Sequence, residues 1–384
     1  MPATAGQVAP AQEAGRAQPQ TTIEPPGGPF IRHAQPGRRQ LYSRSGDAVG
    51  TLITQTIPAT PGYFRKWRIR VAATGGSGAS TAAVSGADQP YNIFSSVQLK
   101  DAFGTVIVQA PGFEAFKLIP MYGGQLGLHA ASDPGNLPSF SAVATSGNFT
   151  FQSGIFFEFV KGIGVISGAN ASLLPTLQLV GNATPYGTAP GTLPTLKTIL
   201  EADFYWLPEG VDIAPPGLGT TQQWTVQAAN PTIGSTANVA VQIPRLGGYV
   251  STLIFILRDS TAARIDPFSG VTDPTFQVRL DGVPVIDTTW NTFLDDLQIE
   301  FAGAANAQWT RPTGTWAWTR KTSMNQESLG LLDTGEALLS TNPGTLVEVY
   351  SPNWGTIANA PATLNVLAGV VVPAGSLLQG LPEI

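Results

Sequence analysis

The sequence contains no cysteine in its 384 residues. Disulfides, thiolate metal sites and cysteine nucleophiles are therefore excluded. Charge is also scarce, because Asp, Glu, Lys and Arg together make up 12% of the chain, which is about half the usual share. The net charge of −5 disfavours a chain that binds polyanions over its whole surface.

Long apolar runs are missing too. Residues 1–20 lack the apolar core of a signal peptide. The longest apolar stretch, Val366 to Val372, ends at Pro373 and is far shorter than the ~18 residues of a membrane helix. The sequence thus predicts a chain that is made and folded in the cytoplasm.

Residues that could support catalysis are few and poorly placed. The two histidines, His33 and His129, have no partners at the spacing of a metal site or a catalytic triad. Asp295, Asp296 and Glu300 fall in or just after one expected short helix, whereas a glycosidase needs carboxylates that face each other across a cleft. We therefore expect no catalytic residues, no cofactor and no enzymatic activity.

A calcium site is conceivable in one loop, because hard cations favour loop carboxylates. Asp259, Asp266 and Asp273 share this loop with Arg258 and Arg264. Their spacing does not fit an EF-hand loop, so the sequence favours solvated loop charges and predicts no metal site.

Turn residues and strand residues dominate what is present. The chain has 43 Gly and 32 Pro, and short runs of β-branched and aromatic residues lie between them. Glu and Lys, which usually cover helix surfaces, are scarce. This combination predicts an all-β protein with many turns.

One seven-residue motif occurs twice and indicates a duplication. Residues 57–63 and residues 243–249 both read Ile-Pro-x-x-x-Gly-Tyr. Their offset, 243 − 57 = 186 residues, is close to half of the chain, and such a self-match suggests two copies of one domain.

The expected elements follow the same order in both halves: strand, loop, strand, turn, strand and short helix. Residues 97–99 match residues 278–280 at an offset of 181. The pair Asp281-Gly282 between two apolar runs predicts a hairpin, and Pro284 places the second run at a sheet edge. Apolar residues spaced i, i+3, i+4, i+7 from Trp290 predict about two turns of amphipathic helix.

We therefore predict two tandem eight-stranded jelly-roll sandwiches, a double jelly roll, with short helices and long loops. Residues 1–44 are expected to form an extended N-terminal arm and residues 45–210 the first jelly roll. Residues 211–222 are rich in Pro and Gly and are expected to link it to the second jelly roll, 223–384.

Two groups of side chains are candidates for contacts between molecules. Arginines gather in and just after the arm, and tryptophans alternate with arginines between 309 and 320. Interleaved aromatics and arginines can bind single-stranded nucleic acid or sugars, but both residue types are also favoured at protein interfaces, which is the interpretation we prefer. The assembly candidates are Arg32, Arg38, Arg39, Arg44, Trp309, Arg311, Trp316, Trp318 and Arg320.

Taken together, the chain resembles the double jelly-roll major capsid proteins, with the tectivirus-like, internal-membrane icosahedral bacteriophages as the nearest group. The repeated Ile-Pro-x-x-x-Gly-Tyr, the strand-turn-strand segments 97–109 and 278–286, and the helices near Phe113 and Trp290 carry the resemblance.

The resemblance implies a structural subunit that forms homotrimers, packs as pseudo-hexagonal capsomers and builds an icosahedral virion shell. Implied partners are neighbouring capsomers, minor capsid and penton proteins, and an internal membrane contacted through the arm. Sequence-specific nucleic-acid binding is not expected. The alternative hypothesis is a β-sandwich that binds a receptor or a carbohydrate, such as a phage spike or a lectin-like module.

Overall fold

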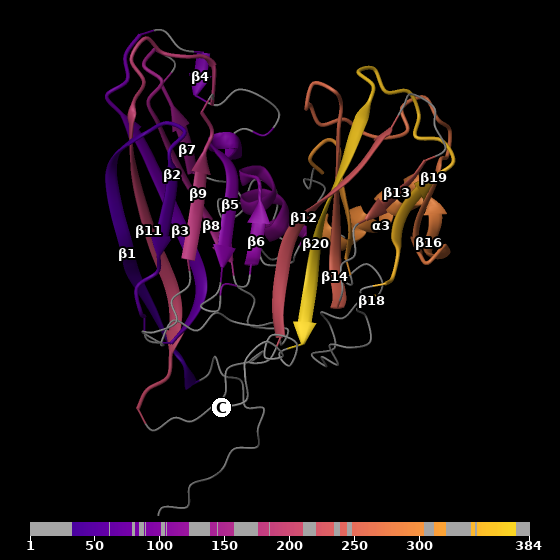
Figure 1. Cartoon of the computed structure of the whole chain (residues 1–384), viewed down its shortest axis with the longest axis horizontal. Coiled ribbons are helices and arrows are strands. Elements are labelled where there is room, and N and C mark those ends of the chain that lie inside the picture. Colours follow the sequence, from indigo (N-terminus) through magenta and orange to yellow (C-terminus); the bar gives the residue numbers. More distant parts are fainter. Residues whose placement is uncertain are drawn as a thin grey trace, which may run out of the picture.

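The computed structural model describes residues 33–60, 62–78, 81–83, 88, 90–100, 104, 106–122, 139–143, 145–156, 176–183, 185–209, 220–233, 239–243, 248–302, 311–319, 339–341 and 344–373. Two β-sandwiches lie side by side along the long axis of the molecule (Figure 1). In the described part of the chain, no helix is long and apolar enough to span a bilayer.

The first sandwich is built from two antiparallel sheets. One runs in the order β1 (Gln35–Ala48), β11 (Thr195–Trp206), β3 (Tyr63–Thr74), β8 (Phe149–Phe156), β7 (Ser139–Ala142). The other runs β2 (Leu52–Thr56), β9 (Thr176–Gly181), β5 (Phe94–Lys100), β6 (Val106–Ala110). A two-stranded ribbon of β4 (Thr81–Ala83) and β10 (Tyr186–Thr188), and the short helices η1 (Tyr91–Ile93), η2 (Glu114–Leu118) and α2 (Ile119–Tyr122), complete it.

The second sandwich repeats this topology in its eight main strands. One sheet runs β12 (Thr220–Ile233), β20 (Ala362–Pro373), β14 (Gly248–Arg258), β17 (Thr315–Thr319), with β18 (Leu339–Thr341) also paired to β14. The other runs β13 (Val239–Ile243), β19 (Val347–Ser351), β15 (Thr275–Leu280), β16 (Val283–Thr289), and α3 (Trp290–Ala302) follows β16.

Each sandwich therefore contains the eight strands of a jelly roll, which confirms the predicted fold. Counting these eight strands in chain order, the first pairs with the last and the last with the third in both copies. The second pairs with the seventh, the seventh with the fourth and the fourth with the fifth. The strands β1, β3, β6 and β11 of the first copy thus correspond to β12, β14, β16 and β20 of the second.

The predicted hairpin and helices are present. Asp281 and Gly282 both have positive φ, 49° and 81°, as a two-residue type I′ turn requires. Pro284 lies on β16, the last strand of its sheet. In α3 the side chains of Trp290, Phe293 and Leu297 are buried, which is the stripe expected from their spacing.

Aromatic side chains close each sandwich in the same way. In the second copy Trp290 of α3 contacts Phe276 of β15 and Trp316 of β17, with ring centroids 5.7 and 5.2 Å apart. In the first copy Phe116 of η2 contacts Phe94 of β5 and Phe151 of β8 at 5.8 and 5.9 Å. The helix after the fifth jelly-roll strand, β6 or β16, is thus an internal part of both cores.

Two predicted domain boundaries need correction. Residues 35–44 were expected in the arm but form the first part of β1, and residues 220–222 were expected in the linker but begin β12. β1 was hidden because Leu41 and Asp47 are the only residues it buries, so its apolar periodicity is weak. Its order comes from the backbone ladder with β11.

The repeated motif lies between the second and third strands of each copy, which are β2 and β3 in the first and β13 and β14 in the second. Ile57 and Ile243 are buried in the core, and the Gly-Tyr pairs stand at the start of β3 and β14. At Gly62 φ is +98°, and an added Cβ would lie 2.0 Å from the carbonyl oxygen of Tyr205. Only glycine fits this position.

We predict that Gly62→Ala lowers the free energy of unfolding by about 2 kcal/mol more than Gly75→Ala. Gly75 also has positive φ, +83°, but an added Cβ meets nothing within 4 Å, so this control carries the backbone strain without the clash. Denaturant unfolding followed by tryptophan fluorescence measures both variants. Equal losses would show that the contact with Tyr205 is unimportant.

Candidate functional site at the junction of the two jelly rolls

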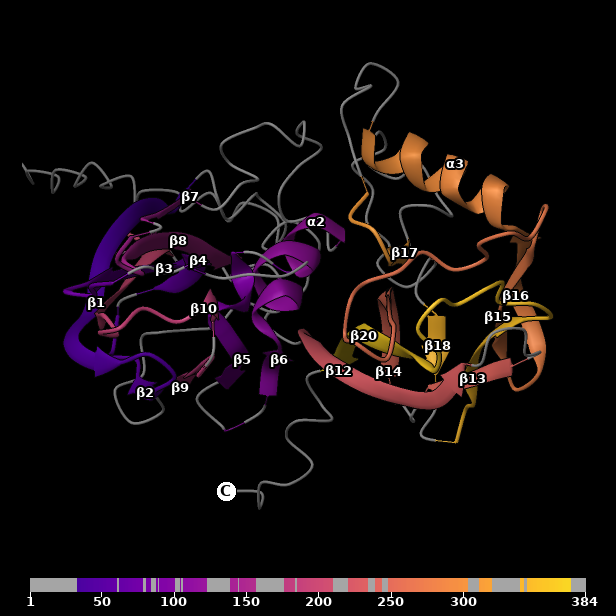
Figure 2. The same ribbon diagram turned by 90° about the horizontal axis from the view of Figure 1, so that it is seen from above.

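The two sandwiches share one continuous sheet. Strand β6 of the first pairs in parallel with β12 of the second, with Val108 opposite Trp224 and Gln109 opposite Thr225. Both strands would otherwise be sheet edges, and the pairing satisfies backbone groups that an open edge leaves unpaired. Seen from above, the shared sheet runs through the middle of the molecule (Figure 2).

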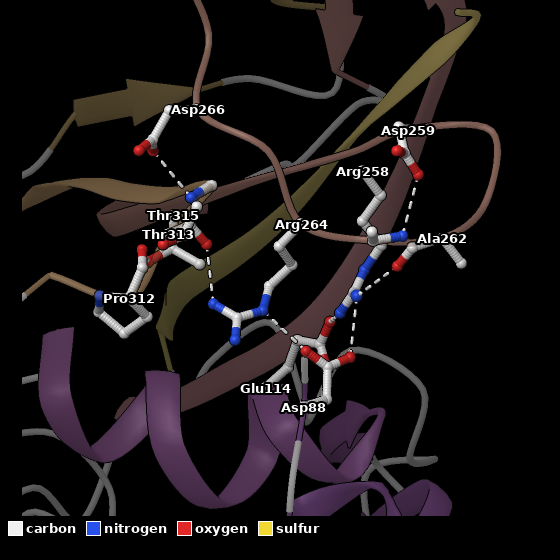
Figure 3. Close-up of polar contacts among 12 residues, drawn as sticks. Asp88, Glu114, Arg258, Asp259, Ala262, Arg264, Asp266, Pro312, Thr313 and Thr315 are labelled. Atoms are coloured by element: carbon white, nitrogen blue, oxygen red, sulfur yellow. Dashed lines mark hydrogen bonds and ion pairs between the residues drawn. The ribbon is translucent and has the colours of Figure 1, made fainter. Parts of the chain in front are cut away.

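Beside this shared sheet, arginines from the second jelly roll meet carboxylates from the first (Figure 3). Arg258, the last residue of β14, places one guanidinium nitrogen 2.8 Å from Asp88 and another 3.1 Å from Glu114. Arg258 retains 15% exposure of its side chain, Asp88 20% and Glu114 3%. These are partly or fully desolvated ion pairs, which are stronger than pairs at the surface.

Arg264 adds a second cation to the same cluster. Its Nε donates to Asp88 at 2.8 Å and one terminal nitrogen donates to the carbonyl of Thr313 at 2.8 Å. The guanidinium lies 4.3 Å from the ring centroid of Phe113, which is a cation–π contact. Asp88 therefore bridges the two arginines, and Arg264 links the first jelly roll to the loop before β17.

Burial governs the electrostatics of Glu114. Desolvation raises the pKa of its carboxyl group, and the nearby charge of Arg258 opposes that rise without cancelling it. The second carboxylate oxygen of Glu114 is buried and has no hydrogen-bond partner among the described residues. Burial alone would lower the pKa of Arg258, but Glu114 and Asp88 raise it overall, so this arginine stays charged.

A second polar contact lies on the far side of the cluster. The hydroxyls of Tyr122 in α2 and Thr315 in β17 are 3.2 Å apart and buried. Arg311 donates to the carbonyl of Thr315 at 2.7 Å and pairs with Asp266 at 2.7 Å. The start of β17 is therefore contacted by both jelly rolls, and Arg311 ties the loop before it to Asp266.

The predicted arginines at the start of the chain lie on the outer edge of the first sandwich. Arg38 pairs with Asp203 at 2.7 Å yet keeps 56% exposure, and Arg44 pairs with Asp47 at 2.7 Å. Arg39 makes a long hydrogen bond of 3.4 Å to the carbonyl of Ala59. All three belong to β1, so they sit together on one strand as a basic edge.

The aromatic segment is divided between core and junction. Trp316, predicted as an assembly candidate, is instead a core residue: it is fully buried and stacks on Phe255, with ring centroids 5.5 Å apart. Trp318 is partly buried against the same core. Arg311 belongs to the junction, whereas Arg32, Trp309 and Arg320 lie outside the described residues.

Two of the three carboxylates considered for calcium, Asp259 and Asp266, accept hydrogen bonds from protein donors. Asp259 accepts hydrogen bonds from Thr261, Ala263 and Asn359, and Asp266 accepts one from the backbone of Gly314 at 2.8 Å. Both therefore act as loop-ordering residues. Asp295 and Asp296 are exposed on α3.

Sequence reasoning missed Asp88 and Glu114. Asp88 was part of a loop rich in Gly, Ser and Ala, and Glu114 interrupts an apolar helix whose other inward residues are aromatic or aliphatic. A lone carboxylate among core residues is a signal for a buried ion pair, but its partner is 144 residues away.

Solved viral structures share this double jelly-roll fold. A chain of Sulfolobus Turreted Icosahedral Virus matches with a TM-score of 0.57 and 17% identity, over 91% of this chain and 94% of that one. The major capsid protein P2 of bacteriophage PM2 matches with a TM-score of 0.50 and 10% identity, over 88% and 98%.

A chain of the PBCV-1 virus capsid matches with a TM-score of 0.56 and 11% identity, over 88% of this chain and 93% of that one. No family model and no curated protein sequence matches the chain. The similarity is therefore one of architecture, and it spans both sandwiches.

We predict that Arg258→Met lowers the free energy of unfolding by about 3–5 kcal/mol, because it leaves the buried carboxyl group of Glu114 without its cation. The double variant Glu114→Gln/Arg258→Met should recover part of the loss. Arg70→Met is the matched control, since Arg70 is 51% exposed and 3.7 Å from Glu201, and it should cost under about 1 kcal/mol. Similar losses at both arginines in chemical denaturation would contradict the prediction.

Glu114 should also make stability depend on pH. Its pKa is higher in the folded chain than the ordinary 4.5, so the folded state binds the proton more tightly. This contribution is complete below pH 4.5 and is lost as the pH rises through the folded pKa. Glu114→Gln should remove that component from the pH profile of the unfolding midpoint. An unchanged profile above pH 4.5 would contradict the assignment.

Proposed function

We propose that this chain is a major capsid subunit, three copies of which form a pseudo-hexagonal capsomer of an icosahedral virion. The observation that carries the proposal is the pair of complete jelly rolls joined edge to edge within one chain. Two similar sandwiches per chain give six around a threefold axis, and a six-sided unit tiles a surface. The solved viral structures with the same doubled fold support this function.

The distribution of chemistry favours a structural role. Most buried side chains of the described residues are apolar, and the buried polar groups of the junction bind one another. Low overall charge suits a protein that covers much of its outside with obligate contacts. A lectin-like module would need an exposed aromatic groove, but Trp316, one of the tryptophans considered for that role, is buried.

Finer parts of the function rest on this proposal. We propose that residues before β1 contact neighbouring subunits or an internal membrane, and that minor capsid and penton proteins complete the shell. The assignment to the tectivirus-like group is a prediction on the same footing, as is the division of the chain into an arm before β1, two domains and a linker before β12.

We predict that the purified full chain has a solution mass near three times 40.1 kDa, about 120 kDa, by light scattering coupled to size exclusion. Negative-stain electron micrographs should show six-lobed particles, because each copy contributes two sandwiches. A stable monomer that binds a glycan would overturn the capsid function in favour of a binding module.

A further inference from the structure

We propose that β1 of one copy docks on β16 of a second copy, as the intermolecular counterpart of the internal pairing between β6 and β12. The inference rests on the proposed function, because it names the contact that joins the copies within a capsomer. The partner is thus a second copy of this chain, bound head to tail.

The duplication itself identifies the two strands. β16 occupies in the second jelly roll the place that β6 occupies in the first, and β1 occupies the place of β12. The internal pair is already joined. Of the described strands, none pairs with the outer edge of β1 or of β16, so each is an open edge of the kind that recruits another strand.

The positions of the two edges allow a ring and forbid closure within one chain. β1 lies at the outer end of the first sandwich and β16 at the outer end of the second, in both views (Figures 1 and 2). A head-to-tail contact between different surfaces closes into a ring when its rotation divides the circle. Three copies would give six similar junctions, three within chains and three between them.

The register of the internal junction places the contact on particular residues. Trp224 faces Val108, and the offset between the copies, 224 − 186 = 38, makes Arg38 the counterpart of Trp224. Leu99 pairs with Val108 as Leu280 pairs with Val283, so Val283 is the counterpart of Val108. The proposed contact therefore centres on residues 38–39 and 283–285.

Apolar surface supports this location. Val108 is 3% exposed in the internal junction, whereas Val283 and Val285 are 64% and 45% exposed on β16. Two exposed valines on an open edge strand are a surface that association would cover. Pro284 between them lacks a backbone donor, so side chains must supply much of the contact.

Charge has the same polarity at both junctions. In the internal one, the side of β6 and η2 carries Glu114 and the opposite side carries Arg258. In the proposed one, the side of β16 and α3 carries exposed Asp287, Asp295 and Asp296. β1 carries exposed Arg39, together with Arg38 and Arg44, which are exposed but also pair with Asp203 and Asp47 of their own chain. Complementary charges favour this pairing and select against two like edges meeting.

Disulfide cross-linking tests the register of the contact. Because the chain has no native cysteine, only the introduced cysteines can form disulfides. Each of four double variants combines Arg38→Cys or Arg39→Cys with Val283→Cys or Val285→Cys in the full chain. At least one should give covalent trimers on mild oxidation, seen by non-reducing electrophoresis. Leu52→Cys/Val285→Cys is the matched control, because Leu52 is 55% exposed on β2, outside the proposed contact, and should give none.

The outcomes separate this inference from the proposed function. If light scattering shows trimers but none of the four pairs cross-links them, the β1–β16 contact is overturned and the capsid function stands. The same conclusion follows if the control pair cross-links equally well. A chain that stays monomeric at every concentration would overturn both.

Charge reversal provides an independent readout. Arg39→Glu alone, and Asp295→Lys/Asp296→Lys alone, should each raise the dissociation constant of the trimer about tenfold. The three changes in one chain should restore most of the affinity, because every junction then pairs Glu with Lys. Lys197→Glu on β11, an exposed position inside the sheet, controls for net charge. Failure of the combined variant to recover would overturn the contact.

Discussion

The pairing of two sheet edges, β6 and β12, is the constraint on which the rest of this structure depends. A β-sandwich leaves unpaired backbone groups at its edges, and exposed edges promote uncontrolled association. This chain joins one edge of each sandwich to the other in a short parallel ladder. The ladder is short, so side chains must hold it: Arg258, Asp88 and Glu114 lock the sandwiches together beside it.

The buried ions at this junction fix where charged side chains of the two sandwiches meet. Burying an ion pair costs desolvation energy that its attraction only partly offsets, which is consistent with the raised pKa of Glu114. An arginine held between two carboxylates permits one arrangement of neighbours, whereas an apolar contact tolerates sliding. Asp88 is shared by Arg258 and Arg264, so these charges form one connected network.

Much of the fold could be predicted from the sequence because its signals are local. The type I′ turn at Asp281-Gly282, the stripe on α3 and the duplicated Gly-Tyr each depend on residues within a few positions of one another. β1 could not be predicted, because its partner β11 lies about 160 residues away and its exposed face carries little periodicity. The ion pairs of the junction could not be predicted for the same reason, because Glu114 and Arg258 are 144 residues apart and meet only once both sandwiches are folded.

The parallel direction of β6 and β12 has a consequence for any surface built from this chain. An antiparallel junction would turn one sandwich upside down relative to the other. A parallel one makes each strand of the second sandwich point the same way as its counterpart in the first, and repeating the same operation from copy to copy preserves that direction. A layer made in this manner therefore has two chemically different sides, since all turns of one kind emerge above it and all turns of the other kind below. The difference between the two sides of such a layer therefore follows from the parallel direction of one ladder of two residue pairs.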